Sequence, residues 1–187
     1  MNATSATRMN RRLPWTTALA LLATAAGQAG ESPGLGEPLA PDEVAALDFT
    51  VLPDGRGLPA GEGSVGEGAR LYAARCLACH GEEGRGGIND ELAGGAGSLA
   101  GPAPVKTVGS YWPSATTVFD YLRRAMPYEA PGSLTADDYY ALTAYLLYLN
   151  GIVDADARLD ARSLPAVRMP NRDNFDHGWP PDAAEGG

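Results

Sequence analysis

The sequence is poor in the large side chains that build a hydrophobic core. Phe, Trp and Tyr make up 7% of its 187 residues, whereas it contains 24 glycines and 15 prolines. So much Gly and Pro indicates that part of the chain is irregular. With so few large side chains, a buried cofactor would add to the stability of a domain of this size.

Basic residues are also scarce. The chain has 14 Lys and Arg against 23 Asp and Glu, which gives a formal net charge of −9. This balance excludes nucleic acid as a partner, because binding there depends on neutralising phosphates. A basic protein surface is a suitable partner; the alternative is that the charge only keeps the protein soluble.

The sequence lacks a hydrophobic run long enough to span a bilayer. The apolar stretch from Ala18 to Ala26 is shorter than the roughly 20 residues that a transmembrane helix needs. A basic segment with Arg11 precedes it, and small residues follow at 27–29. This order is typical of a secretory signal peptide, residues 1–29. It predicts a periplasmic protein without a membrane span after cleavage; an uncleaved anchor is the alternative.

Three further segments follow the predicted signal peptide. Residues 30–63 are rich in Gly, Pro and acidic residues and form an extension, in which only PDEVAAL (41–47) favours a short helix. Residues 64–152 predict one domain, and residues 153–187 predict an irregular tail. The extension and the tail either cover the domain or dock on a partner; solvated linkers are the alternative.

The predicted domain contains three helices. Ser64 and Glu67 form a capping box for the first. The second covers 114–125 and ends before a Met-Pro pair, because a residue that precedes proline is pushed out of the helical region. The third follows the N-cap Thr135, has apolar residues at helical spacing and ends at Asn150 and the glycine after it. No stretch alternates over a useful strand length, so we predict an all-α fold.

Cysteine and histidine are almost absent, with two of each. A structural zinc site needs four ligands, commonly Cys and His, and one of the two histidines, His177, lies in the tail. A redox dithiol also uses C-x-x-C, but it is expected near a βαβ pattern. The sequence shows no such pattern, so neither alternative is favoured.

The stretch CLACH, Cys76 to His80, has the C-x-x-C-H pattern of haem c attachment. Two thiols add across the two vinyl groups of the porphyrin, and the two residues between them let both sulfurs reach one edge. His80 follows directly and supplies a neutral imidazole to the iron. A single motif predicts one covalent haem, held by Cys76, Cys79 and His80.

The other axial position has several candidates. Electron-transfer cytochromes commonly use Met, which raises the reduction potential. Met126 lies between the second and third helices, where a loop can return over the iron, whereas Met169 better suits an apolar anchor for the tail. His177 is a more remote candidate, and an open position would indicate ligand binding or peroxide chemistry. We predict that His80 and Met126 are the two iron ligands.

Other groups would support the haem. The second ring nitrogen of His80 needs an acceptor, and we expect a backbone carbonyl near Pro102 or Pro104. The haem propionates need hydrogen-bond donors, for which a polar and aromatic stretch is suitable. The candidate donors are Ser110, Tyr111, Trp112 and Arg124. For the tryptophan, a half-buried core position is an equal alternative.

With these features the chain resembles class I cytochrome c domains over residues 64–152. The similarity rests on GARLYAARCLACHG, AMP and LTADDYYALTAYLLYLNG. It implies a small all-α class I cytochrome c fold around one covalently bound haem. In that family the helix before the haem motif crosses the last helix. Such a crossing would explain Gly68 and would place Tyr72 near Tyr145.

A closer resemblance extends over residues 41–175. PVKTVGSYWPSATTVFDYLRRAMPYEAPGSLT and LPAVRMPNRDNF are similar to the haem c subunits of periplasmic molybdenum sulfite and sulfur dehydrogenases. The resemblance implies that the chain accepts single electrons from a molybdenum-cofactor subunit and passes them to a downstream cytochrome or oxidase. It also implies haem attachment at Cys76 and Cys79, with His80 and Met126 as iron ligands.

The chain departs from part of that group. The sulfur dehydrogenase cytochrome of the thiosulfate-oxidising system is longer and has a second haem domain, whereas this chain has one haem motif. A freely diffusing carrier for another dehydrogenase or a terminal oxidase is one alternative. A haem sensor or peroxidase with an open iron site is another. We expect no residue to make or break substrate bonds, since the cofactor supplies the redox step.

Overall fold

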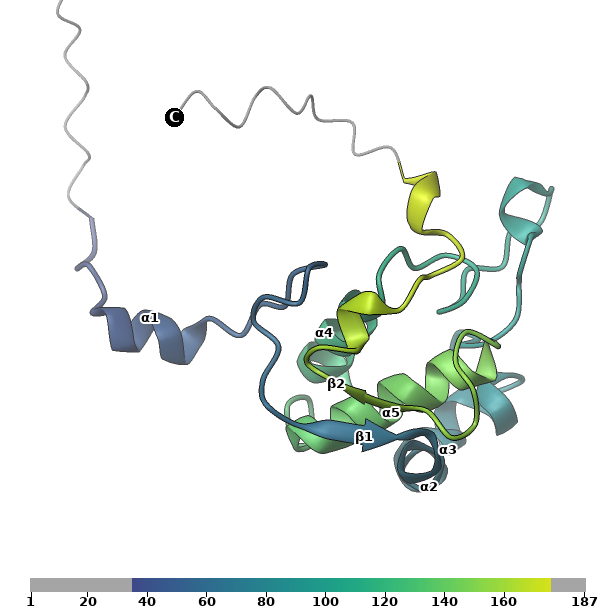
Figure 1. Ribbon diagram of the computed structural model, residues 1–187, viewed down its shortest axis with the longest axis horizontal. Helices are drawn as coiled ribbons and strands as arrows, with labels where there is room; N and C mark the ends of the chain where they lie inside the picture. The colour runs from purple at the N-terminus through teal and green to yellow at the C-terminus, as the bar shows by residue number, and fades with distance from the viewer. Residues whose placement is uncertain (1–34, 176–187) are drawn as a thin grey trace, which may run out of the picture. The chain divides into compact units, whose positions relative to one another are not determined.

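The structure is a computed structural model that describes residues 35–175 (Figure 1). The predicted signal peptide and His177 lie outside the described residues. The chain divides into two compact units, residues 1–44 and 45–187, and the second contains every element from β1 onward. Among the described residues, no helix combines the length and the hydrophobicity that crossing a membrane requires.

The first element is the short helix α1, Pro41–Leu47. Proline suits the first turn, because the N–H that it lacks would have no helical partner there. The N–H of Ala40 donates to the carboxylate of Glu43 at 2.8 Å, which satisfies one free donor at this end. The helix predicted for 41–47 is thus confirmed, and none of its side chains is buried.

Three longer helices build the domain: α2 (Val65–Arg75), α4 (Ala115–Ala125) and α5 (Ala136–Leu149). Capping boxes begin α2 at Ser64 and α5 at Thr135. In each box the N-cap hydroxyl accepts the backbone N–H three residues later, and the carboxylate of that later residue accepts the backbone N–H of the N-cap. The four-residue helix α3 (Leu77–His80) continues from α2. Short 3-10 turns follow at Glu82–Gly84, Ser98–Ala100, Leu164–Ala166 and Arg172–Asn174. The three predicted helices and the all-α class are confirmed.

Helices α2 and α5 cross in close contact at a glycine. A Cβ atom at Gly68 would lie only 2.6 Å from the carbonyl carbon of Ala141 and 2.7 Å from the Cβ of Tyr145. One turn later, the rings of Tyr72 and Tyr145 pack with their centroids 5.3 Å apart. The crossing that the family resemblance implied is therefore confirmed, and glycine allows it because it has no side chain.

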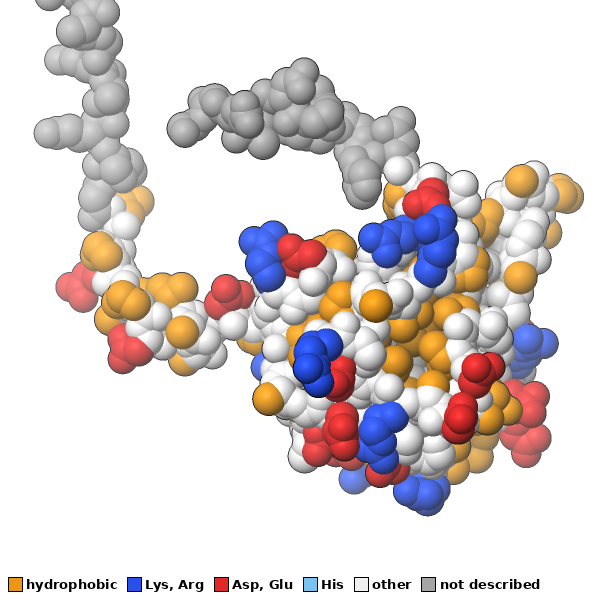
Figure 2. Space-filling model, viewed as in Figure 1, with side chains coloured by type: hydrophobic (Ala, Val, Ile, Leu, Met, Phe, Trp, Pro, Cys, Tyr) orange, Lys and Arg blue, Asp and Glu red, His pale blue; other side chains and the backbone are white. Residues whose placement is uncertain are grey.

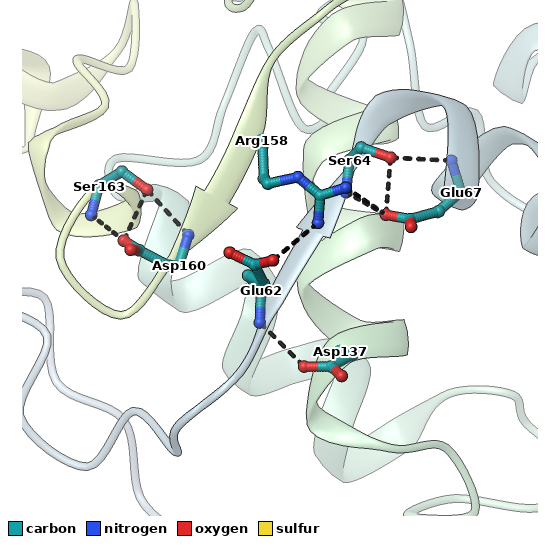
Figure 3. Close-up of polar contacts among 7 residues, drawn as sticks. All are labelled: Glu62, Ser64, Glu67, Asp137, Arg158, Asp160 and Ser163. Atoms are coloured by element: carbon teal, nitrogen blue, oxygen red, sulfur yellow. Dashed lines mark hydrogen bonds and ion pairs between the residues drawn. The ribbon is translucent and has the colours of Figure 1, made fainter.

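Two three-residue strands, β1 (Glu62–Ser64) and β2 (Arg158–Asp160), pair antiparallel with Gly63 opposite Leu159. Figure 3 shows Arg158 reaching across this pair to two carboxylates, Glu62 at 3.1 Å and Glu67 at 3.5 Å. The sequence pattern did not predict these strands, because three residues are too few to show an alternation. The pair joins the start of α2 to the segment that follows α5.

The segment after α5 contributes to the same hydrophobic core as the helices. Leu159, Leu164 and Met169 are buried in one cluster with side chains of α2, α4 and α5. The side-chain amide of Asn171 donates to the carbonyl of Tyr111 at 2.6 Å. Residues 158–171 therefore cover the helices, mostly as irregular backbone between strand β2 and short 3-10 turns.

Tyr140 holds the segment before β1 against α5. Its side chain is fully buried, and its hydroxyl donates to the carbonyl of Pro59 at 2.8 Å. Burial raises the pKa of Tyr140 to about 12. The folded state therefore binds this proton more tightly than the unfolded state, whose pKa is near the ordinary value of 10.

We expect the free energy of unfolding to fall as the pH rises from about 10 to 12, because folding keeps the phenol neutral until its raised pKa is reached. Tyr140→Phe removes this titration, so its stability should fall less steeply over the same interval. Urea unfolding of the haem-loaded protein at a series of pH values measures both slopes. Equal slopes for the two proteins would show that Tyr140 does not carry the effect.

Candidate haem-binding site

A pocket of about 520 Å³ lies among the helices of the domain. This volume is typical of cofactor sites. The four predicted site residues Cys76, Cys79, His80 and Met126 all line it. Much of the remaining wall is aliphatic and comes from a loop and from helices α4 and α5. These side chains are Leu92, Val108, Val118, Leu122, Leu142 and Leu146.

The Cys-x-x-Cys-His motif follows α2 directly: Cys76 (φ −122°, ψ −32°) lies between α2 and the short helix α3. The N–H of Cys76 donates to Tyr72 at 2.8 Å, and those of Cys79 and His80 donate to the carbonyl of Cys76 at 3.1 and 3.0 Å. Residues three and four positions apart lie on one side of a helical turn. The motif therefore presents both sulfurs and the imidazole to the same pocket.

Both cysteines are free, and Cys76 does not have the properties of a redox thiol. Burial raises the pKa of Cys76 to about 11, with further contributions from the negative charges of Cys79 and Glu129. Redox dithiols rely on a lowered pKa, so this alternative is not favoured. Within residues 35–175, no three His, Cys, Asp or Glu side chains gather closely enough to bind a metal ion.

The ring of His80 is oriented by a backbone acceptor. Its Nδ1–H donates to the carbonyl of Asp90 at 2.9 Å, which leaves Nε2 as the free nitrogen. The predicted acceptor near Pro102 or Pro104 was wrong. The chain turns back toward the haem motif well before Pro102, since the N–H of Asn89 already donates to the carbonyl of Cys79 at 3.0 Å.

Glycines make this early return possible. Gly81 has φ 74°, a conformation that glycine adopts without steric cost. A Cβ atom at Gly87 would lie 2.6 Å from the nitrogen of Gly81, so the two parts of the loop touch backbone to backbone. The Gly-rich stretch thus folds tightly enough to place Asp90 against His80.

Met126 is positioned by the end of α4 and by α5. It is the C-cap residue of α4, with its N–H donating to Leu122 at 2.9 Å, and its extended conformation (φ −126°, ψ 148°) is the one that a following proline requires. The hydroxyl of Tyr139 donates to the carbonyl of Met126 and accepts the N–H of Leu134, both at 3.4 Å. These hydrogen bonds fix the backbone of Met126, whose side chain carries the thioether in the pocket wall.

The other candidate methionine, Met169, does not share this position. Met169 is 1% exposed and belongs to the hydrophobic core under the C-terminal segment. It is not among the residues that line the pocket. The structure thus separates two methionines that both precede a proline in the sequence.

Of the four predicted propionate donors, only Trp112 lines the pocket, where its ring packs edge-on against Tyr121 at 5.4 Å. Ser110 is buried elsewhere and donates to the carbonyl of Val105 at 2.7 Å. The guanidinium of Arg124 pairs with Asp120 at 2.7 Å. Ser110, Tyr111 and Arg124 do not line the pocket, and the ring of Tyr111 contacts the ammonium group of Lys106, 5.0 Å from the ring centroid.

Two basic residues in the pocket wall escaped the sequence interpretation. Arg75 ends α2 directly before the first cysteine, and Lys106 lies in the segment that also supplies Val108. The position of Arg75 next to the haem motif is a signal that could have been used. Lys106 has no such local signal, because only the folding of the Gly-rich segment brings it to the pocket.

Asn150 ties the wall of the pocket to the end of α5. Its amide donates to the carbonyls of Leu92 and Leu146 at 3.0 and 2.9 Å, and its oxygen accepts the N–H of Gly94 at 3.2 Å. Asn150→Asp replaces the donor with a carboxylate that faces two carbonyls. We expect a loss of about 1–3 kcal/mol in the free energy of unfolding, since two partly buried acceptors lose their partner.

Guanidinium unfolding of the haem-loaded protein measures this loss. Asn89→Asp is the matched control, because it makes the same chemical change at an exposed position; since Asn89 also lines the pocket, the visible spectrum first checks that the haem of this variant is intact. Equal unfolding midpoints for the two variants would contradict the prediction.

Comparison with known proteins agrees with this geometry. Residues 63–146 match the family model described as cytochrome c oxidase, cbb3-type, subunit III. The crystal structure of the sulfane dehydrogenase SoxCD from Paracoccus pantotrophus contains a chain that is 45% identical, with a TM-score of 0.71. The match covers 82% of this chain and 75% of that one. The chain belongs to the class I c-type cytochromes. No curated protein matches the sequence.

As a class I cytochrome c, the protein binds one haem c covalently and transfers electrons. The pocket fits this group, because it combines an aliphatic wall with two sulfurs and an imidazole whose Nε2 is free. When bound, the haem supplies a one-electron redox centre. The aliphatic wall excludes water, and the bond from His80 to Asp90 fixes the imidazole. Burial and such bonds are the means by which a protein sets the haem potential.

Proposed function

We propose that the chain is the electron-accepting cytochrome subunit of a periplasmic sulfite or sulfur dehydrogenase. The observation that carries this proposal is the 45% identity with a chain of a sulfane dehydrogenase over most of both chains. That similarity extends well beyond the residues that match the general cytochrome family model, 63–146. It supports a shared role more specific than electron transfer alone.

In this proposal Cys76 and Cys79 attach the haem, and His80 and Met126 are the two iron ligands. All four residues line one pocket. The hydrogen bond from His80 to Asp90 leaves the nitrogen that an iron ligand needs. Met126 is supported by its place in the pocket wall, in contrast to Met169 in the core.

The proposed partner is a molybdenum-cofactor dehydrogenase subunit, which oxidises a sulfur substrate and delivers electrons one at a time. The net charge of −9 suits a basic docking surface. Both proteins would meet in the periplasm, to which the predicted signal peptide directs this chain. A downstream cytochrome or oxidase would then reoxidise the haem.

Co-expression with the molybdenum-cofactor subunit of the same organism tests the proposal. We expect a stable complex by size-exclusion chromatography and reduction of the haem when sulfite or a sulfane compound is added, followed in the visible spectrum. Reduction without a stable complex would favour the freely diffusing carrier. If the subunit reduces an artificial acceptor but leaves this haem oxidised, the proposal is wrong.

A further inference from the structure

Helix α1 and the residues before it expose their apolar side chains. The exposed fractions are 87% for Leu35, 54% for Leu39, 48% for Val44 and 66% for Leu47. Figure 2 shows hydrophobic side chains along this part of the chain, with acidic but no basic side chains beside them. We refer to residues 35–47 as the N-terminal arm.

The apolar side chains of the arm are arranged for burial against another surface. Val44 and Leu47 are three positions apart, so they share one side of α1, and Ala45 and Ala46 lie on the other side. Helices shorter than about 12–15 residues are marginal in water without packing, and α1 has seven residues. Exposed apolar residues gathered in one segment mark an interaction site, and a helix of this kind suits a groove.

Charge restricts the chemistry of the surface that receives the arm. The arm contains three acidic residues, Glu37, Asp42 and Glu43, and no Lys or Arg. A second copy of this chain would bring a net charge of −9 to an acidic segment, and anionic lipids would repel it in the same way. An apolar groove with Lys and Arg at its rim complements both features of the arm.

The residues that follow α1 are attached to the cytochrome domain. The guanidinium groups of Arg123 and Arg124 lie over the ring of Phe49, 5.5 and 4.4 Å from its centroid. The N–H of Val51 donates to Asp120 at 3.0 Å. These contacts join the residues that follow the arm to α4. Val118 of α4 lines the haem pocket, so a partner that binds the arm is tethered to a helix of the pocket.

We propose that the N-terminal arm is a docking element that inserts Leu39, Val44 and Leu47 into a basic-rimmed apolar groove on the molybdenum-cofactor subunit. This inference rests on the proposed function and adds the segment by which the two subunits associate. The arm contributes affinity for the molybdenum-cofactor subunit, and none of its residues lines the haem pocket.

Two matched variants test the arm. Val44→Ser with Leu47→Ser removes the apolar side of α1, whereas Ala45→Ser with Ala46→Ser introduces the same two serines on its other side. Serine has a lower helix propensity than alanine, so the control variant loses at least as much helix propensity. The haem-loaded full chain and the molybdenum-cofactor subunit of the same organism are titrated by isothermal calorimetry, and the visible spectrum checks the haem in each variant.

We expect the Val44/Leu47 variant to raise the Kd about tenfold or more, since losing two buried apolar contacts costs more than 1.4 kcal/mol. The Ala45/Ala46 control should bind within about twofold of the wild type. Equal affinities for both variants and the wild type would overturn the docking arm and leave the proposed function intact. A wild-type chain that does not bind the subunit would overturn the proposed function, and this inference with it. A wild-type dimer that the Val44/Leu47 variant dissociates would assign the arm to self-association and also overturn it.

Discussion

Replacing Met126 with alanine is expected to abolish the weak red absorption band that reports sulfur–iron ligation and to lower the reduction potential of the haem. Met126 lies in the pocket wall, and methionine as an axial ligand raises the potential. Axial-ligand identity changes haem potentials over a range of about 0.8 V, so the shift should be large. Absorption spectra of the oxidised protein and potentiometric titration measure the two effects.

Met169→Ala is the control for this experiment. Its side chain lies in the core, so we expect it to keep the band and to lose about 2–5 kcal/mol of stability from the cavity. Loss of the band in the Met169 variant alone would assign the ligand to the C-terminal segment. A wild-type protein without the band that binds carbon monoxide would indicate an open iron site and a sensor or peroxidase.

Substituting alanine at Gly68 is expected to destabilise the protein severely, whereas the same substitution two residues earlier should be harmless. The new methyl group at Gly68 would meet the backbone of Ala141 and the Cβ of Tyr145, at 2.6 and 2.7 Å. Neither neighbour can move unless α2 and α5 separate. Overpacking of this kind costs about 1–3 kcal/mol or more, and the loss of close packing along the crossing adds to it.

Gly66→Ala is the matched control in the same helix. No atom lies within 4 Å of a Cβ at Gly66, and the residue is exposed. We expect it to raise the free energy of unfolding by up to about 1 kcal/mol, because alanine favours the helix over glycine. Guanidinium unfolding of the two haem-loaded variants gives the comparison. If Gly68→Ala were as stable as Gly66→Ala, α2 and α5 would not be in contact at this point.

The helices could be predicted because their signals are local. The capping boxes at Ser64 and Thr135 and the Met-Pro pair after α4 act within a few residues of the boundary they define. The two strands were not predicted, and for the C-terminal segment the sequence left open whether it covers the domain, docks on a partner or is a solvated linker. Leu159, Leu164 and Met169 become core residues only through contacts with helices far away in the sequence.

The surroundings of the haem site were predicted least well. The acceptor for His80 is the carbonyl of Asp90, not one near Pro102 or Pro104. Arg124 is bound to Asp120, and Lys106 takes a place in the pocket wall. The acceptor of His80 and the place of Lys106 depend on how a Gly-rich segment turns, and backbone freedom at glycine leaves little trace in the sequence pattern. The pair of Arg124 with Asp120 is instead a local contact four residues apart within α4.

The pattern Cys-x-x-Cys-His predicted one covalent haem, because two thiols and an imidazole at this spacing match the attachment of haem c. The class I family followed from the resemblance over residues 64–152. The number of haems and the order of the helices are equally local properties. The sequence also favoured Met126 over Met169 as the iron ligand, and the fold has Met126 in the pocket wall and Met169 in the core. The acceptor of His80 and the place of Lys106 depend instead on how the Gly-rich segment folds against the rest of the domain, so only the folded chain shows them.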